Sequence, residues 1–265
     1  MNTSTQSLKN QVSAAEWQRR VELAALYRLT AIHGWDDFLF THISSRVPGP
    51  ERHFLLNPLG LWFEEITASS LVKIDLDGNI LDGEYGINRA GFVIHSAIHA
   101  AREDAHFAIH FHTDDGMALS SQKEGLLPLN QRALAILPQL AYHDYEGIAL
   151  NLDERARLVA DLGDKNQLLL RNHGTLALGR TAAEAWLRIY GLEKAATAQI
   201  RTLTIGREGA LIASEAAQQE VRRQTAPDAP TLDGGDGEAW HKHFDQLVWE
   251  AIRRKVDRLS PGYDS

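Results

Sequence analysis

Apolar residues recur at helical spacing in three long segments of the chain. Residues 14–33 carry an apolar stripe that includes Val21, Leu26 and Leu29, and Gly34 follows as a C-terminal stop. A second helix is predicted from Thr181, its N-cap, to about residue 204. A third covers residues 239–259. Shorter helices are predicted at residues 90–102, 114–121 and 153–162, the last two capped by Thr113 and Asp153.

Short runs of alternating or continuous apolar residues between these helices predict strands. They are residues 43–47, 53–56, 71–76, 79–81, 106–112, 137–142, 167–171 and 175–178. Asp77 and Gly78 form a two-residue hairpin signal between two of them. Because helices alternate with strands and hairpins are frequent, we expect a layered α/β or α+β domain with a mixed or antiparallel sheet.

The domain organisation follows from local composition. Residues 1–14 are predicted to form a mobile polar tail, and residues 226–237, rich in Pro, Gly and Asp, a linker. The main domain is expected over residues 15–225 and a C-terminal helical extension over residues 238–265.

Charge and cysteine content narrow the class of protein. The 265 residues carry a formal net charge of −8, which argues against a general nucleic-acid or anionic membrane surface. The chain has no cysteine, so any metal ligands must come from His, Asp, Glu or water. We find neither the apolar core of a signal peptide nor an apolar run long enough to span a bilayer, and expect a cytoplasmic protein.

Three histidines form the candidate metal site. His110 and His112 alternate with Phe111 in the predicted strand, so their side chains point to the same face while the phenylalanines occupy the other. Neutral imidazole is a common ligand for transition metals. His173, after another apolar run, supplies a third ligand. The alternative reading, that the paired histidines are exposed polar residues of an alternating strand, is weakened by the third histidine.

Several motifs together resemble the class II aldolase/adducin family, in its adducin-like bacterial branch, over residues 15–205. The segments that carry the resemblance are residues 41–46 (THISSR), 57–60 (NPLG), 65–69 (EITAS), 110–113 (HFHT), 125–128 (GLLP), 142–147 (YHDYEG) and 172–174 (NHG). The resemblance implies a three-layer α/β/α domain with a largely antiparallel central sheet, and a homotetramer with active sites between subunits. It also implies one divalent ion per subunit at His110, His112 and His173. Zinc is the first expectation, with manganese or Fe(II) as alternatives.

The chain departs from the sugar-phosphate aldolases of that family where substrate is bound. The glutamate that serves as their acid/base falls on Gly91, and two phosphate-binding serines fall on Arg89 and Ala90. The family's Gly-Asn pair falls on Thr41 and His42, and its Thr-Gly on Leu59 and Gly60. Cleavage of a sugar phosphate by the standard route is therefore not expected. The substrate-binding candidates are Arg89, His42 and Gly60.

Three residues are candidates for the missing acid/base: Asp114, Tyr142 and His143. Asp114 follows the metal strand and the other two end a predicted strand, although a structural role suits each equally well. His95 and His99 lie one helical turn apart; we expect His99 on the helix surface or in packing, and His95 near the metal.

The resulting functional hypothesis is a metal-dependent carbon–carbon lyase that cleaves an aldol or decarboxylates a small hydroxy- or keto-acid. Two alternatives stay open. One is a non-heme Fe(II) oxygenase on the same fold. The other is a non-catalytic, adducin-like interaction module of the actin and cytoskeleton type.

Overall fold

The computed structural model describes residues 8–148, 151–226, 229 and 237–265. An eight-stranded sheet forms its centre, in the order β4-β3-β2-β1-β5-β8-β7-β6. The strands are β1 (His42–Arg46), β2 (Phe54–Leu56), β3 (Val72–Ile74), β4 (Ile80–Asp82), β5 (Phe107–Phe111), β6 (Leu140–His143), β7 (Gln167–Leu170) and β8 (Gly174–Gly179). All neighbouring strands are antiparallel except β6 and β7.

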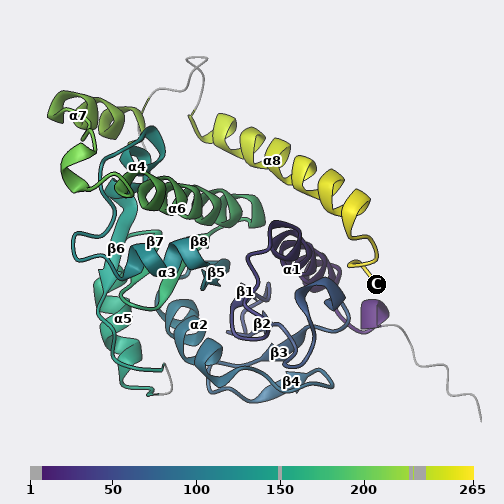
Figure 1. Cartoon of the computed structure of the whole chain (residues 1–265). Coiled ribbons are helices and arrows are strands. Elements are labelled where there is room, and N and C mark those ends of the chain that lie inside the picture. Colours follow the sequence, from purple (N-terminus) through teal and green to yellow (C-terminus); the bar gives the residue numbers. More distant parts are fainter. Residues whose placement is uncertain (1–7, 149–150, 227–228, 230–236) are drawn as a thin grey trace, which may run out of the picture.

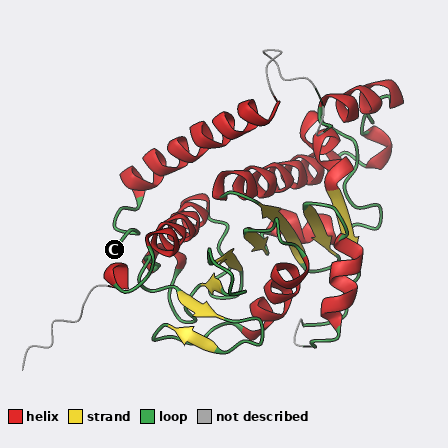
Figure 2. Ribbon diagram, turned by 180° about the vertical axis from the view of Figure 1, so that it is seen from behind, coloured by secondary structure: helices red, strands yellow, loops and turns green. Residues whose placement is uncertain are grey.

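The helices cover both faces of this sheet (Figures 1 and 2). They are α1 (Ala14–His33), α2 (Arg89–Ala101), α3 (Asp114–Ser120), α4 (Gln131–Ile136), α5 (Glu154–Leu162), α6 (Ala182–Leu203), α7 (Glu215–Gln224) and α8 (Gly237–Leu259), with short 3-10 turns at Leu8–Asn10, Phe63–Glu65, Leu137–Gln139 and Arg207–Gly209. Helices α1 and α6 lie on one face and α2 and α5 on the other, while α8 packs along α1 and α6. The expected α/β/α layering around a largely antiparallel sheet is confirmed.

Strand β5 is the central strand of the site, and its two faces enter different parts of the core. Phe107, Ile109 and Phe111 pack in the apolar cluster with α1 and α6, whereas Ala108 packs with α2 and α5. The predicted alternation is therefore correct. The other face is also covered, however, since His110 is completely buried. Its imidazole is not an exposed polar residue of an alternating strand.

Most predicted elements lie within a few residues of their expected limits, with three corrections. Asp153 does not cap α5 with its side chain, because its own backbone is already helical. The strand expected at residues 137–142 begins as a 3-10 turn, in which Pro138 has no amide hydrogen to pair, and becomes β6 only at Leu140. Helices α4 and α7 were not predicted; both are short, and α7 is almost wholly exposed.

Two of the predicted domain limits fall partly outside the described residues: residues 1–7 of the tail, and residues 227–228 and 230–236 of the linker. Within the part of the chain that is described, no helix is long and apolar enough to cross a membrane.

Candidate metal centre

Two adjacent strands bring the three candidate ligands together. His110 lies in β5 and His112 directly after it, while His173 lies in the tight turn between β7 and β8. Strands β5 and β8 are antiparallel neighbours, with Phe111 opposite Thr175. The turn that carries His173 is therefore next to the end of β5, although more than 60 residues separate it from His110 and His112.

The three imidazoles converge through their Nε2 atoms. The Nε2 of His112 lies 2.8 Å from that of His110 and 3.0 Å from that of His173, and the remaining pair is 3.3 Å apart. Three nitrogen ligands about 2.0–2.1 Å from a tetrahedral zinc ion would be about 3.3 Å from one another. A small movement of the side chains would therefore place the three histidines around one ion. Among the described residues, these three form the cluster that could hold a metal ion.

The opposite ring nitrogens of two ligands are held by acceptors. Nδ1 of His110 donates to the carbonyl oxygen of Thr175 at 2.8 Å, and Nδ1 of His112 lies 3.0 Å from a carboxylate oxygen of Asp37. Because a hydrogen on Nδ1 leaves Nε2 with its lone pair, these contacts set the tautomer that binds metal. Burial, reinforced by the neighbouring histidines, lowers the pKa of His110 well below its ordinary value and that of His173 to about 4. Both rings are thus neutral at pH 7.

The sequence Asn-His-Gly makes the turn that presents His173. Asn172 has a φ of 55°, in the left-handed region, which asparagine adopts more readily than most other non-glycine residues. At Gly174 a Cβ atom would lie 2.2 Å from the carbonyl oxygen of Phe111, so no side chain can be accommodated there without a shift of the backbone. Asn172 and Gly174 therefore allow this turn to lie close to the end of β5.

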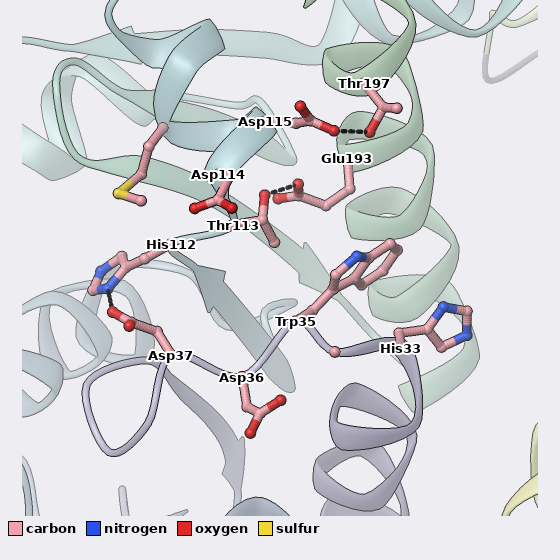
Figure 3. Close-up of a pocket in the computed structure, with 12 residues that line it drawn as sticks. His33, Trp35, Asp36, Asp37, His112, Thr113, Asp114, Asp115, Glu193 and Thr197 are labelled. Carbon is pink, nitrogen blue, oxygen red and sulfur yellow. Dashed lines mark hydrogen bonds and ion pairs between the residues drawn. The ribbon is translucent and has the colours of Figure 1, made fainter.

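A cavity of about 400 Å³ opens beside His112 (Figure 3). It is lined by His33, Gly34, Trp35, Asp36, Asp37, His112, Thr113, Asp114, Asp115, Met117, Glu193 and Thr197. Glu193 is buried and accepts hydrogen bonds from Thr113 and Thr175, and burial raises the pKa of its carboxyl group. The cavity wall is rich in carboxyl groups, so it favours a metal ion or a hydrogen-bond donor over an anion.

His42 completes the centre on the side of α2. It lies directly opposite His110 in the pairing of β1 with β5, and the two ring centroids are 4.9 Å apart. A Cβ atom at Gly91 would lie 2.5 Å from Cδ2 of His42. The imidazole of His42 therefore fills the space beside Gly91, at the position where the resemblance places a glutamate.

The sequence matches the model of the Class II Aldolase and Adducin N-terminal domain over residues 21–200. The chain belongs to this family. A Caulobacter vibrioides protein named for the class 2 aldolases is 61% identical over 260 residues, which are 98% of this chain and 96% of that protein. Alpha-adducin of Rattus norvegicus is 40% identical over 250 residues, covering 92% of this chain but 33% of the adducin. The crystal structure of an aldolase II superfamily protein from Pseudomonas syringae superposes with a TM-score of 0.88 at 47% identity, covering 98% of this chain and all of the other.

Within this aldolase and adducin fold, the predicted acid/base candidates lie in different surroundings. Asp114 is exposed and lines the cavity beside His112. The hydroxyl of Tyr142 accepts the amide of Leu126 instead, with its ring beneath Arg171. His143 is buried between two carboxylates, at 2.7 Å from Asp161 and 3.4 Å from Glu154. Of the three, Asp114 is thus the one that faces the cavity.

The substrate-binding candidates also separate. Arg89 begins α2 and is exposed, two residues before the glycine that contacts His42. Gly60 lies in an exposed loop, with a φ of 106°. His42 is buried against His110 and His95. Its contact with Gly91 was not predicted, because no local pattern relates the two positions.

Proposed function

We propose that this family member is a metal-dependent carbon–carbon lyase that acts on a small hydroxy- or keto-acid, by aldol cleavage or decarboxylation. The observation that carries the proposal is the convergence of the Nε2 atoms of His110, His112 and His173 at 2.8–3.3 Å. A divalent ion, when bound, supplies the Lewis acid that stabilises the enediolate left when the carbon–carbon bond breaks. Zinc is our first expectation for its identity.

The residues around the ligands have separate tasks in this proposal. Asp37 and the Thr175 carbonyl hold two ligand rings in the metal-binding tautomer. Arg89, which begins α2 and is not part of the acidic cavity wall, pairs with the carboxylate of the substrate. Asp114, on the cavity wall, exchanges a proton with the product. Decarboxylation of a β-keto acid needs no base to begin, which makes it compatible with Gly91 in place of a glutamate.

Elemental analysis tests the proposal. The protein is purified in air and anaerobically, beside a His110→Ala/His112→Ala variant and a His106→Ala control. His106 begins the same segment of chain, but its ring bonds the carbonyl of Arg180. Near-stoichiometric zinc or manganese, lost only in the double variant, followed by release of aldehyde or CO₂ from hydroxy- or keto-acids, supports the lyase. Iron would instead favour the Fe(II) oxygenase.

Two observations favour a second candidate, a non-catalytic interaction module. The chain is 40% identical to a segment of alpha-adducin, and Gly91 provides no carboxylate at the position of the family's acid/base. Absence of bound metal after incubation with each ion, together with co-sedimentation with actin filaments, would support this candidate. We also propose that the protein is cytoplasmic and forms a homotetramer. Light scattering on the purified protein tests the number of subunits.

A further inference from the structure

A buried chain of hydrogen bonds runs behind the metal centre, between β1 and α2. Nδ1 of His99 lies 3.0 Å from the carbonyl oxygen of Ala105, and its Nε2 lies 2.7 Å from Oγ of Ser44. The same hydroxyl contacts Nδ1 of His95, and Nε2 of His95 lies 2.8 Å from Nδ1 of His42. All four side chains are at most 2% exposed. We call Ser44, His95 and His99 the relay.

The three rings of this chain are neutral. Among the described residues, none of the rings is hydrogen-bonded to a carboxylate, and a buried imidazolium without such a partner is strongly disfavoured. Arg46, which donates to the carbonyl of His99, places a further positive charge nearby. Accordingly, burial lowers the pKa of His99 to about 3. This histidine contacts none of the three proposed metal ligands.

Neutral rings give the relay a single direction. A carbonyl oxygen only accepts, so Nδ1 of His99 carries the hydrogen and its Nε2 accepts from the hydroxyl of Ser44. Ser44 in turn accepts from Nδ1 of His95. Nε2 of His95 then has a lone pair and accepts from Nδ1 of His42. The Nε2 of His42 is consequently left without hydrogen, as an acceptor only.

The acceptor nitrogen of His42 lies beside Gly91 and on the same sheet face as His110. Among the described residues, nothing hydrogen-bonds to this nitrogen. It is also not one of the buried side-chain atoms without a partner, which are Ser45 Oγ and Arg46 Nε. Nε2 of His42 therefore keeps a small accessible area, although the side chain as a whole is 2% exposed.

We propose that Ser44, His95 and His99 are positioning residues that fix His42 as a hydrogen-bond acceptor at the metal centre, and that His42 thereby selects a substrate with a hydroxyl group. A nitrogen that only accepts can bind the hydrogen of a hydroxyl group. A carbonyl or ether oxygen has no such hydrogen, so its lone pair is repelled by the lone pair of the nitrogen. This inference rests on the proposed function, and it narrows the substrate class from hydroxy- or keto-acids in general to those acids that carry a hydroxyl group, with or without a keto group.

The first test reads the tautomer of His42 in metal-free protein by ¹⁵N NMR of labelled histidine. We expect a hydrogen on Nδ1 and none on Nε2 in the wild type. Two matched variants are compared. Ser44→Ala interrupts the relay, whereas Ser45→Ala removes the neighbouring hydroxyl group of β1, which has no hydrogen-bond partner among the described residues. The first should lose the single tautomer and the second should keep it. A hydrogen on Nε2 in the wild type, or an unchanged tautomer in Ser44→Ala, overturns the relay.

The second test measures selection by calorimetry on zinc-loaded protein, with glycolate against methoxyacetate, which lacks the hydroxyl hydrogen. We expect the wild type and Ser45→Ala to bind glycolate about tenfold more tightly, the effect of one hydrogen bond. Ser44→Ala and His42→Ala should bind the two acids within about threefold of each other. Equal binding of both acids, or of neither, by zinc-loaded wild type overturns selection by His42. Failure to load any of zinc, manganese or Fe(II) would instead refute the proposed function, and the tautomer measurement would still decide the relay.

Discussion

The imidazole of His42 occupies the space that a side chain at Gly91 would need. A Cβ atom at that glycine would lie 2.5 Å from Cδ2 and 2.9 Å from Nε2 of His42. The two residues come from β1 and from the first turn of α2, and each restricts what the other can be. A glutamate at position 91 and the observed position of His42 are mutually exclusive. A larger residue at position 91 would therefore require His42 to move.

Gly91→Ala should destabilise the protein through this contact. Overpacking costs about 1–3 kcal/mol, which exceeds the gain of at most about 1 kcal/mol from replacing a helical glycine with alanine. We expect a net loss of up to about 2 kcal/mol in the free energy of unfolding, measured by urea denaturation. In a His42→Asn background the smaller side chain should remove most of the loss. An equal loss in both backgrounds would show that His42 is not the cause.

Asp37→Asn should weaken metal binding without abolishing it. The carboxylate of Asp37 orients His112, and loss of such a partner reduces metal affinity by about 10–100-fold. The measurement is a zinc titration in competition with a chromophoric chelator. Asp36→Asn is the control, since Asp36 lines the same cavity but points away from His112 (Figure 3). If both variants lose the same affinity, the cause is the general negative charge of the cavity.

Asn172→Ala should lower the free energy of unfolding by about 1 kcal/mol, because alanine is strained at the left-handed φ of 55°. Asn172→Gly should cost less, since glycine adopts this conformation without strain. Thermal or urea unfolding of the metal-free variants measures both. An alanine variant as stable as the wild type would show that the turn relaxes to another conformation.

The buried histidines should make the metal-free protein less stable in acid. The pKa of His99 is about 3 in the folded chain against an ordinary 6.5. Between these values the unfolded chain binds a proton that the folded chain does not, so the free energy of unfolding falls as the pH falls. One such group contributes a slope of at most about 1.4 kcal/mol per pH unit.

His99→Gln should therefore flatten the dependence of stability on pH between about 3 and 6.5, measured by urea unfolding in the presence of a chelator. The control is His241→Gln, at an exposed position of α8. If the slope is unchanged in His99→Gln, His99 is not the cause of the dependence of stability on pH.

Local patterns in the sequence determined much of this protein. Alternation along β5 assigned Phe107 and His110 to opposite faces, and the helical stripe of α1 together with Gly34 predicted its extent within a residue or two. Capping by Thr113 and Thr181 was also predicted correctly. These features depend on φ/ψ preferences and on the period of side chains along one element, which neighbouring residues encode.

Tertiary structure decided the contacts between elements. Asp37 reaches His112 across 75 residues of sequence, and His42 reaches His95 across 53. Neither contact follows from a period or a cap, because each depends on how two packed elements are placed relative to one another. The sequence by itself therefore determined which histidines could hold a metal. The packing of α2 on β1 decided that His42 stands beside Gly91 with one nitrogen fixed by the relay, since only close-packed side chains set that geometry.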